Sequence, residues 1–260
     1  MTLPKITNKQ IEILNLIYTY RFLNRIQIQA FLNHKYHKRI NDWLKDLTQK
    51  EYLGRIYSNK LGENTKPAIY YAEANAIKYY KSLGQDNANY LKKLYRDNER
   101  SRSFIDEQVF LADICLKLTA INAKGEINYT FETAVGVTLN PLYEFMEDLS
   151  PQLLFTKKTK TESKQYILVQ LDSISPKYIV KKKMKNYIEF FYTNEWEENT
   201  GQPFPAILLA CETLALMIYA KRTMKWLLDE YQEPEEFDAW FAINDDIRKK
   251  GISAEIWELT

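Results

Sequence analysis

Apolar residues recur every three or four positions in the first 50 residues, which is the spacing of amphipathic helices. The first such run follows Thr7, and Gln10 stands at the capping-box distance from that threonine. Asn24 can cap a second, shorter run, and a third extends from Arg39 to about Lys50. The pattern therefore predicts three helices at the start of the chain.

The period changes after residue 50. Residues 52–57 and 67–71 have the pattern of two strands, and the polar segment 58–66 between them is typical of a hairpin connection. A further helix is expected over residues 74–83. Three helices followed by a hairpin is the order of a winged helix-turn-helix domain. We predict such a DNA-binding domain over residues 1–84.

Two segments of this region, LKDLTQKEYLGRIY and YYAEANAIKYY, resemble winged-helix domains of bacterial regulators. In such domains the third helix enters the major groove, and the hairpin tip touches the neighbouring backbone. The resemblance implies a groove-facing side drawn from His34, Lys35, His37, Lys38, Arg39, Asn41 and Asp42. It implies a core-facing side formed by Trp43, Leu44 and Leu47.

These residue types suit direct readout of a duplex. Lys and Arg can contact guanine or phosphate, Asn can contact adenine, and polar groups at a hairpin tip can contact phosphates. The predicted DNA-binding residues are Lys35, His37, Lys38, Arg39, Asn41, Lys60, Asn64 and Lys66. The histidines have no carboxylate or thiol partner at ligand spacing, so we predict no metal site there.

The charge is distributed unevenly along the chain. Residues 1–100 hold 18 Lys and Arg against 9 Asp and Glu, whereas residues 101–260 hold 18 against 25. An excess of Lys and Arg is typical of a phosphate-binding surface, although a solvated, lysine-rich helical face would give the same count.

Helices and strands alternate in the second half. Residues 85–102 have the composition of a charged linker or helix, and a helix follows from Phe104 to the turn at Lys124 and Gly125. Strands are then expected at 127–132, 149–155, 165–172, 204–210 and 240–243, with helices at 178–192 and 214–231. This alternation predicts an α/β domain over residues 103–260.

The segments SPQLLF, YILVQLDS, KKKMKNYIEFF and FPAILLACET, in this order, resemble the replication-relaxation family, and the ending FAINDDIRKKGISAEIW is also similar. Members of that family are proteins of plasmids and other mobile elements. They join an N-terminal winged helix to a core of the PD-(D/E)XK nuclease superfamily. The resemblance implies an α+β winged helix followed by an α/β restriction-endonuclease-like domain.

The resemblance also implies where a nuclease site would lie. Active members of the superfamily hold Mg²⁺ with an Asp after a Pro and an acidic residue on the next strand, beside a Lys. Here Pro151 is followed by Gln152, and the acidic place on the next strand is Gln170, which leaves Asp172 alone. Neutral amides bind Mg²⁺ far more weakly than carboxylates, so we expect no catalysis, no metal and no cofactor.

Two features of this half keep other interpretations open. Glu132 would supply a second carboxylate if its strand lay beside Asp172, and the chain would then be a Mg²⁺-dependent DNA endonuclease. Nine lysines lie between residues 156 and 185. Lys181, Lys182 and Lys185 among them are candidates for a second contact with a DNA backbone, or for a solvated helix face.

Several protein classes are disfavoured. No apolar run reaches the length of about 20 residues that a transmembrane helix needs, and the N-terminus lacks the apolar core of a signal peptide. We therefore expect a cytoplasmic protein without a membrane partner. Cys115 and Cys211 lie in apolar stretches, which predicts buried free thiols.

The sequence favours a sequence-specific double-stranded DNA-binding protein of a plasmid or mobile element. It would act as a transcriptional regulator or as an accessory in replication, conjugation or transposition. The degenerate nuclease-like domain would serve dimerisation or partner binding, and we expect a homodimer and a protein partner in a replication or transfer complex. The alternatives are the Mg²⁺-dependent endonuclease and a protein-interaction module that does not bind DNA.

Overall fold

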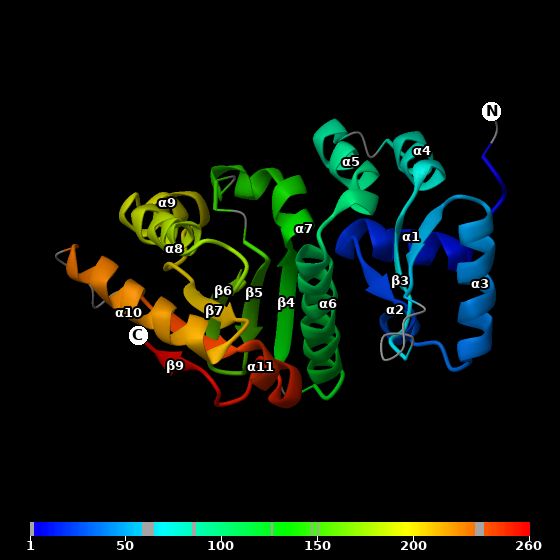
Figure 1. Ribbon diagram of the computed structural model, residues 1–260. Coiled ribbons are helices and arrows are strands. Elements are labelled where there is room, and N and C mark those ends of the chain that lie inside the picture. Colours follow the sequence, from blue (N-terminus) through cyan, green and yellow to red (C-terminus); the bar gives the residue numbers. More distant parts are fainter. Residues whose placement is uncertain are drawn as a thin grey trace. The chain divides into compact units, whose positions relative to one another are not determined.

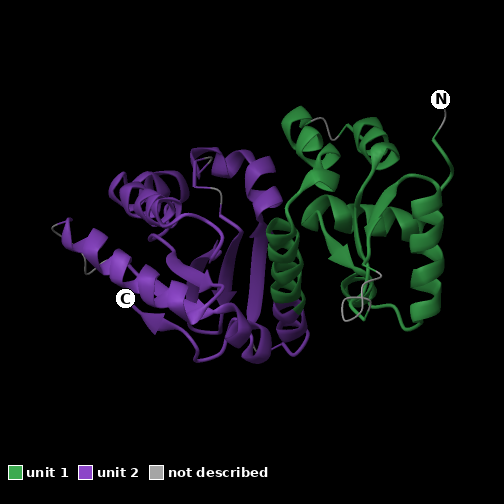
Figure 2. Ribbon diagram, in the orientation of Figure 1, with its two compact units in different colours: residues 1–116 green, residues 117–260 purple. Residues whose placement is uncertain are grey.

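The computed structural model describes residues 3–58, 65–84, 87–125, 127–146, 148–149, 151–231 and 237–260. It is an α+β protein with two compact units, residues 1–116 and 117–260 (Figure 2). Unit 1 combines helices with a three-stranded sheet, and unit 2 combines helices with a six-stranded sheet (Figure 1). The predicted boundaries at residues 84 and 102 both fall inside unit 1.

Local capping signals start the first two helices of unit 1. At α1 (Asn8–Tyr20) the Thr7 hydroxyl accepts the Gln10 N–H, and the Gln10 side chain accepts the Thr7 N–H at 2.9 Å. At α2 (Arg25–Phe31) the Asn24 side chain accepts the N–H groups of the second and third helical residues. Both predicted caps are confirmed. The third helix, α3 (His37–Gln49), begins two residues earlier than predicted.

The small sheet of unit 1 is antiparallel. Its strands are β1 (Leu23–Asn24), β2 (Leu53–Ile56) and β3 (Ile69–Ala72), in the order β1-β3-β2. Gly54 on β2 is required by close packing, since a Cβ there would stand 2.1 Å from the Tyr71 ring on β3. The helix α4 (Ala74–Ser82) follows, as predicted.

The predicted charged segment 85–102 contains ordered helices. These are α5 (Ala88–Tyr95) and the 3-10 turn η1 (Asp97–Glu99), and α6 (Arg102–Asn122) comes next. Tyr90, Leu91 and Leu94 of α5 are buried, and the Tyr90 hydroxyl donates to the carbonyl of Tyr18. The charged side chains of α5 occupy its outer face, so the segment packs as part of unit 1.

A buried ion pair joins α5 and η1 to the end of α1. Asp97 is 0% exposed and accepts from Arg21, whose Nε lies 3.2 Å from Oδ2 and whose Nη2 contacts Oδ1. Arg100 lies 3.6 Å from the same carboxylate, and both guanidinium groups stand over the Phe104 ring. Burial raises the pKa of Asp97, while Arg21 and then Arg100 act in the opposite direction.

Unit 2 is built on a mixed sheet in which the strands follow chain order. Strands β4 to β6 are antiparallel, β6 to β8 are parallel, and β9 is antiparallel to β8. The strands are β4 (Asn128–Thr133), β5 (Leu153–Lys158), β6 (Ser163–Leu171), β7 (Ala206–Cys211), β8 (Ala239–Ile243) and β9 (Glu258–Leu259).

Two helices that follow parallel strands cover one face of this sheet (Figure 1). They are α8 (Lys177–Tyr192) and α10 (Leu214–Asp229). The shorter helical elements are α7 (Ala134–Leu139), η2 (Pro141–Met146), α9 (Glu195–Thr200) and α11 (Asn244–Lys250). The sequence pattern predicted α8 and α10 but missed α7, η2 and α9, whose few turns carry no sustained period.

Three further expectations concern the core and the membrane. The predicted strand at 149–155 starts too early, because the ladder of β5 begins at Leu153, after the buried Pro151. Cys115 and Cys211 are buried and are not joined in a disulfide, as predicted, and burial raises the pKa of Cys211 to about 12. No helix among the described residues is long and apolar enough to cross a membrane.

Candidate nucleic-acid interface

The helix α3 separates its apolar and polar residues onto two faces. Ile40, Leu44 and Leu47 are fully buried in unit 1, at the spacing of one helical stripe. The residues predicted to read DNA are exposed: Lys38 and Asp42 lie opposite this stripe, Arg39 and Asn41 flank it, and His37 lies at the N-terminal end of the helix. Lys35, in the turn before α3, is exposed as well. We call these exposed residues of α3 and of the turn before it the α3 surface.

Trp43 departs from the predicted core position. It is half-buried, and its ring meets the His34 ring edge-on with 5.0 Å between centroids. The Arg39 guanidinium stands 5.7 Å from the same ring. Because Trp43 is one residue off the buried stripe, its ring lies at the edge of the α3 surface and supports Arg39 from one side.

Hydrogen bonds define the turn between α2 and α3. The His34 Nδ1 accepts the Tyr36 N–H at 3.2 Å, and the Gln29 side chain donates to the His34 carbonyl at 3.0 Å. Tyr36 itself is 65% exposed, and the Lys35 ammonium lies 5.9 Å from its ring. Among the residues that the structure describes, no group of three or more His, Cys, Asp or Glu could hold a metal ion.

The hairpin contributes a second set of exposed groups. Lys60 and Asn64 lie outside the described residues, whereas Lys66 is exposed just before β3. Arg55 on β2 is exposed too, with its guanidinium 4.8 Å from the Tyr57 ring. The sequence-based prediction missed Arg55, and strand alternation gives no signal for it, because Arg55 stands two residues after the buried Leu53 and so shares its face of the strand.

The α3 surface and the hairpin strands lie near each other. Tyr52, just before β2, donates its N–H to the Leu47 carbonyl, so β2 begins beside the C-terminal end of α3. From there β2 runs antiparallel to β3. Figure 1 shows the start of β3 and the N-terminus of α3 toward the same end of this unit.

The three lysines proposed for a second backbone contact lie on α8 in different environments. The Lys181 ammonium stands 3.7 Å from the centroid of the Trp226 ring on α10. Lys185 pairs with Glu189 at 3.1 Å, and this hydrogen bond is the main cause of its raised pKa. Lys182 is exposed and makes no ion pair or ring contact with the described residues. Of the three, Lys182 is the most available to an anion.

Gln152 and Gln170, the amides at the predicted metal-ligand positions, lie in the hydrogen-bonded region at the ends of β5 and β6. The Gln152 Oε1 accepts the Gln170 N–H at 3.0 Å, which continues the pairing of β5 and β6 beyond its last ladder residue. Gln170 is 3% exposed, and its side-chain amide has no hydrogen-bond partner among the described residues. The Lys183 ammonium donates to the backbone carbonyl of Gln170 at 2.8 Å.

Glu132 and Asp172, the two carboxylates of the alternative nuclease interpretation, lie far apart because strand β5 runs between their strands. Glu132 on β4 pairs with Leu154 on β5, which pairs with Ile167 on β6, five residues before Asp172. Strand spacing and rise place the two backbone positions about 19 Å apart. Asp172 accepts from the N–H groups of Ile174 and Ser175 and from the Ser175 hydroxyl. The condition on which the nuclease alternative depended, that the strand of Glu132 lies beside Asp172, is therefore not met.

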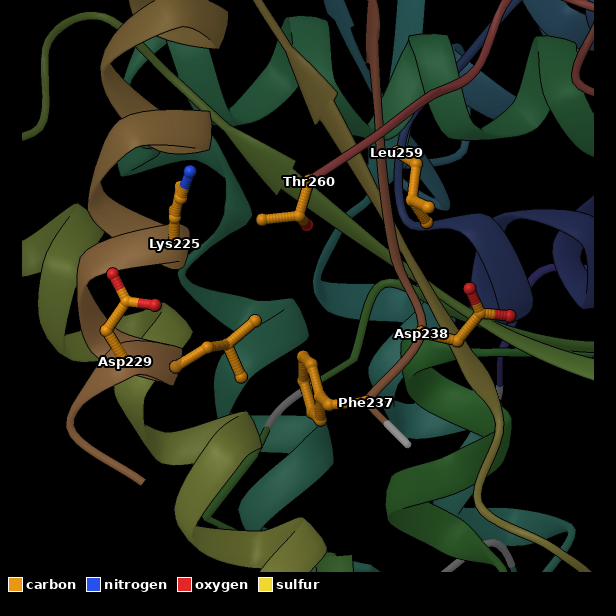
Figure 3. Close-up of a pocket in the computed structure, with 7 residues that line it drawn as sticks. Lys225, Asp229, Phe237, Asp238, Leu259 and Thr260 are labelled. Carbon is orange, nitrogen blue, oxygen red and sulfur yellow. The ribbon is translucent and has the colours of Figure 1, made fainter. Parts of the chain in front are cut away.

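Unit 2 also holds a pocket of about 350 Å³. Lys225 and Asp229 come from α10, and Leu259 and Thr260 come from the C-terminal segment opposite (Figure 3). Asp238 at its edge is already engaged by Lys164 at 2.8 Å and by the Trp240 indole N–H. Among the lining residues that the structure describes, one Lys and one Asp remain at the rim, which is fewer cations than a phosphate site needs.

Comparison with known proteins identifies the family. The family model described as replication-relaxation matches residues 14–207, which include most of unit 1 and the sheet of unit 2 as far as β7. The chain belongs to the replication-relaxation family, as its sequence motifs predicted. This membership associates it with replication. No curated protein and no solved structure matches the chain.

Proposed function

We propose that the chain is a double-stranded DNA-binding protein of a plasmid or mobile element, in which unit 1 is a winged-helix reader. The observation that carries this proposal is the exposed α3 surface, where Lys35, Lys38, Arg39 and Asn41 lie together. Element order supports it, since three helices are followed by an antiparallel hairpin. The basic balance of residues 1–100 supports it as well.

In this proposal α3 enters the major groove and the hairpin strands face the adjoining backbone. The buried stripe of α3 fixes the helix on unit 1, so its polar face can be presented rigidly to base edges. The Arg39 guanidinium lies beside the Trp43 ring, which restricts its motion in the free protein. Its side chain therefore loses less conformational entropy when it binds. Exposed cations next to the recognition helix suit phosphates, so in this proposal Lys66 and Arg55 contact the backbone. A homodimer on paired half-sites is part of the proposal.

Arg39→Ala is expected to relax base preference at one position of the site. A guanidinium that donates two hydrogen bonds to guanine is worth about 1–3 kcal/mol of discrimination. The measurement is selection of bound fragments from a random duplex library, with wild type and variant in parallel. Lys81→Ala, which removes a charge from α4, is the matched control and should leave the selected motif unchanged. An identical motif from Arg39→Ala and wild type would remove Arg39 from the reading surface.

We also propose that unit 2 is a nuclease-like domain without nuclease activity. A Mg²⁺ ion between phosphates is held by clustered carboxylates, and here amides stand at two of the expected positions. The remaining carboxylate, on Asp172, accepts three hydrogen bonds from its own turn. Glu132 is too distant to complete the site, and its carboxylate instead lies over Gly136, where a Cβ would stand 2.1 Å from Oε2.

Incubation with supercoiled plasmid and Mg²⁺ or Mn²⁺ is therefore expected to leave the plasmid intact. Because divalent ions are needed by this class of nuclease, a parallel reaction in a chelator serves as the background. Nicking that appears with the ions and disappears in Asp172→Ala would contradict the proposal and favour the endonuclease. A gel shift that is absent, or insensitive to salt, would favour the third interpretation, an interaction module without DNA binding.

A further inference from the structure

Exposed apolar side chains are concentrated on one part of unit 2. Of the thirteen large hydrophobic residues that are exposed among those described, six lie on α8, on α10 or in the turn before α8. We call these six residues the α8–α10 patch: Ile174, Tyr178, Ile179, Leu214, Ile218 and Trp226. Isolated apolar side chains on a surface are ordinary, but a cluster of this kind marks an interaction site.

The patch lies on two adjacent helices. On α10, Leu214, Ile218 and Trp226 follow one another at multiples of four residues, and they are 54%, 43% and 47% exposed. The inner face of α10 is buried in the core of unit 2. The Tyr219 hydroxyl donates to the Lys177 carbonyl at 3.1 Å, which joins the N-terminal turns of α8 and α10. The outer apolar side chains of α10 therefore stay exposed to solvent and are not buried by the rest of the fold.

The charges around the α8–α10 patch are mainly positive. Exposed cations on the two helices are Lys177, Lys182, Arg222 and Lys225. Asp172 and Glu212 already accept hydrogen bonds from the turn before α8: Asp172 from Ser175, and Glu212 from the Ser173 N–H at 2.6 Å. A third carboxylate, on Asp229, is exposed three residues after Trp226, at the end of α10. A ligand of the patch thus meets apolar side chains between cations.

This charge argues against a second copy of the same patch as the occupant. In a two-fold symmetric dimer the patch would face itself, and its cations would oppose cations, which costs free energy. Nucleic acid is also a poor fit. The Lys181 ammonium covers the Trp226 ring and Lys177 lies 5.1 Å from the Tyr219 ring, so bases cannot stack freely there. The remaining contact area at Leu214 and Ile218 is aliphatic.

We propose that the α8–α10 patch binds an acidic, amphipathic segment of another protein. Apolar side chains at helical spacing would pack on Tyr178, Leu214 and Ile218, and flanking carboxylates would pair with Lys182 and Arg222. This inference rests on the part of the proposed function that gives unit 2 a role in partner binding. It does not depend on DNA binding by unit 1.

The test uses the full chain and three fluorescein-labelled peptides of 18 residues. The first has Leu at helical spacing flanked by Glu, the second has the same composition without the stripe, and the third has Lys in place of Glu. Fluorescence anisotropy is expected to show binding of the first peptide, at least ten-fold weaker binding of the second, and no binding of the third. Ile218→Glu and the double variant Lys182→Glu/Arg222→Glu should each weaken binding of the first peptide at least ten-fold.

Leu142→Glu is the matched control, since Leu142 is 74% exposed on η2 of the same unit. It should bind the peptide as wild type does. Ile218→Glu should retain any duplex DNA binding of the wild type, which separates failure of this inference from failure of the DNA-binding proposal. Equal binding of the scrambled peptide, or unchanged binding by Ile218→Glu, would overturn the inference. So would displacement of the peptide by a single-stranded oligonucleotide, or a dimer that Ile218→Glu converts to monomer in sedimentation.

Discussion

Asp97→Ala is expected to lower the free energy of unfolding of unit 1 by about 3–5 kcal/mol, because it leaves the Arg21 guanidinium buried without its partner. The Arg21 side chain is 10% exposed and its carboxylate partner 0%. Arg100 cannot replace the missing negative charge, since it is itself a cation beside the same carboxylate. Urea denaturation followed by far-UV circular dichroism measures the change.

The control for this prediction is an exposed ion pair in the same unit. Lys9 and Glu12 lie 2.7 Å apart on α1 with about half of each side chain exposed, so Glu12→Ala should cost no more than about 0.5 kcal/mol. Asp97→Asn should fall between the two, because the amide oxygen can still accept a hydrogen bond from Arg21. If Asp97→Ala unfolds at the wild-type urea concentration, the pair does not join α1 to η1 as the structure indicates.

Replacing Lys35, Lys38 and Arg39 together by Ala is expected to weaken duplex DNA binding roughly 100-fold, with three interactions each worth on the order of 1 kcal/mol. The three side chains are exposed, so the fold should be unaffected. For every phosphate that is no longer neutralised, the slope of log K against log salt should also fall by about 0.9. Fluorescence anisotropy at several salt concentrations gives both quantities.

The matched control removes the same charge elsewhere on unit 1. Lys81, Lys92 and Lys93 are exposed on α4 and α5, and their triple replacement by Ala should weaken binding far less than the α3 variant does. If both triple variants lose the same affinity, the interaction depends on the net charge of unit 1 and not on the α3 surface.

Local signals in the sequence were sufficient for much of the fold. The caps at Thr7 and Asn24 are made by residues two or three positions away, so the sequence contains all of their determinants. The long helices α8 and α10 carry enough apolar residues at helical spacing to be predicted. By contrast, α9 has six residues and is bounded by left-handed backbone at Asn194 and Gly201, which gives no periodic signal.

The candidate site shows where prediction from local patterns stops. The winged-helix resemblance implied a core position for Trp43, and the contact with His34, from the preceding turn, shows that it lies at the surface edge. The lysines of α8 form one cationic set in the sequence, yet Lys181 stands over Trp226, which is 45 residues away. Likewise, the separation of Glu132 and Asp172 depends on the register of three strands. These are tertiary contacts, which residue patterns along one chain do not specify.

The most direct test of duplex binding by unit 1 is a titration of the wild-type protein with a random double-stranded library at 50 mM and 200 mM salt. The account predicts binding that weakens steeply between the two concentrations, by about 10³-fold if six phosphates are neutralised. Binding that is undetectable at 50 mM salt, or equal at both, would contradict it.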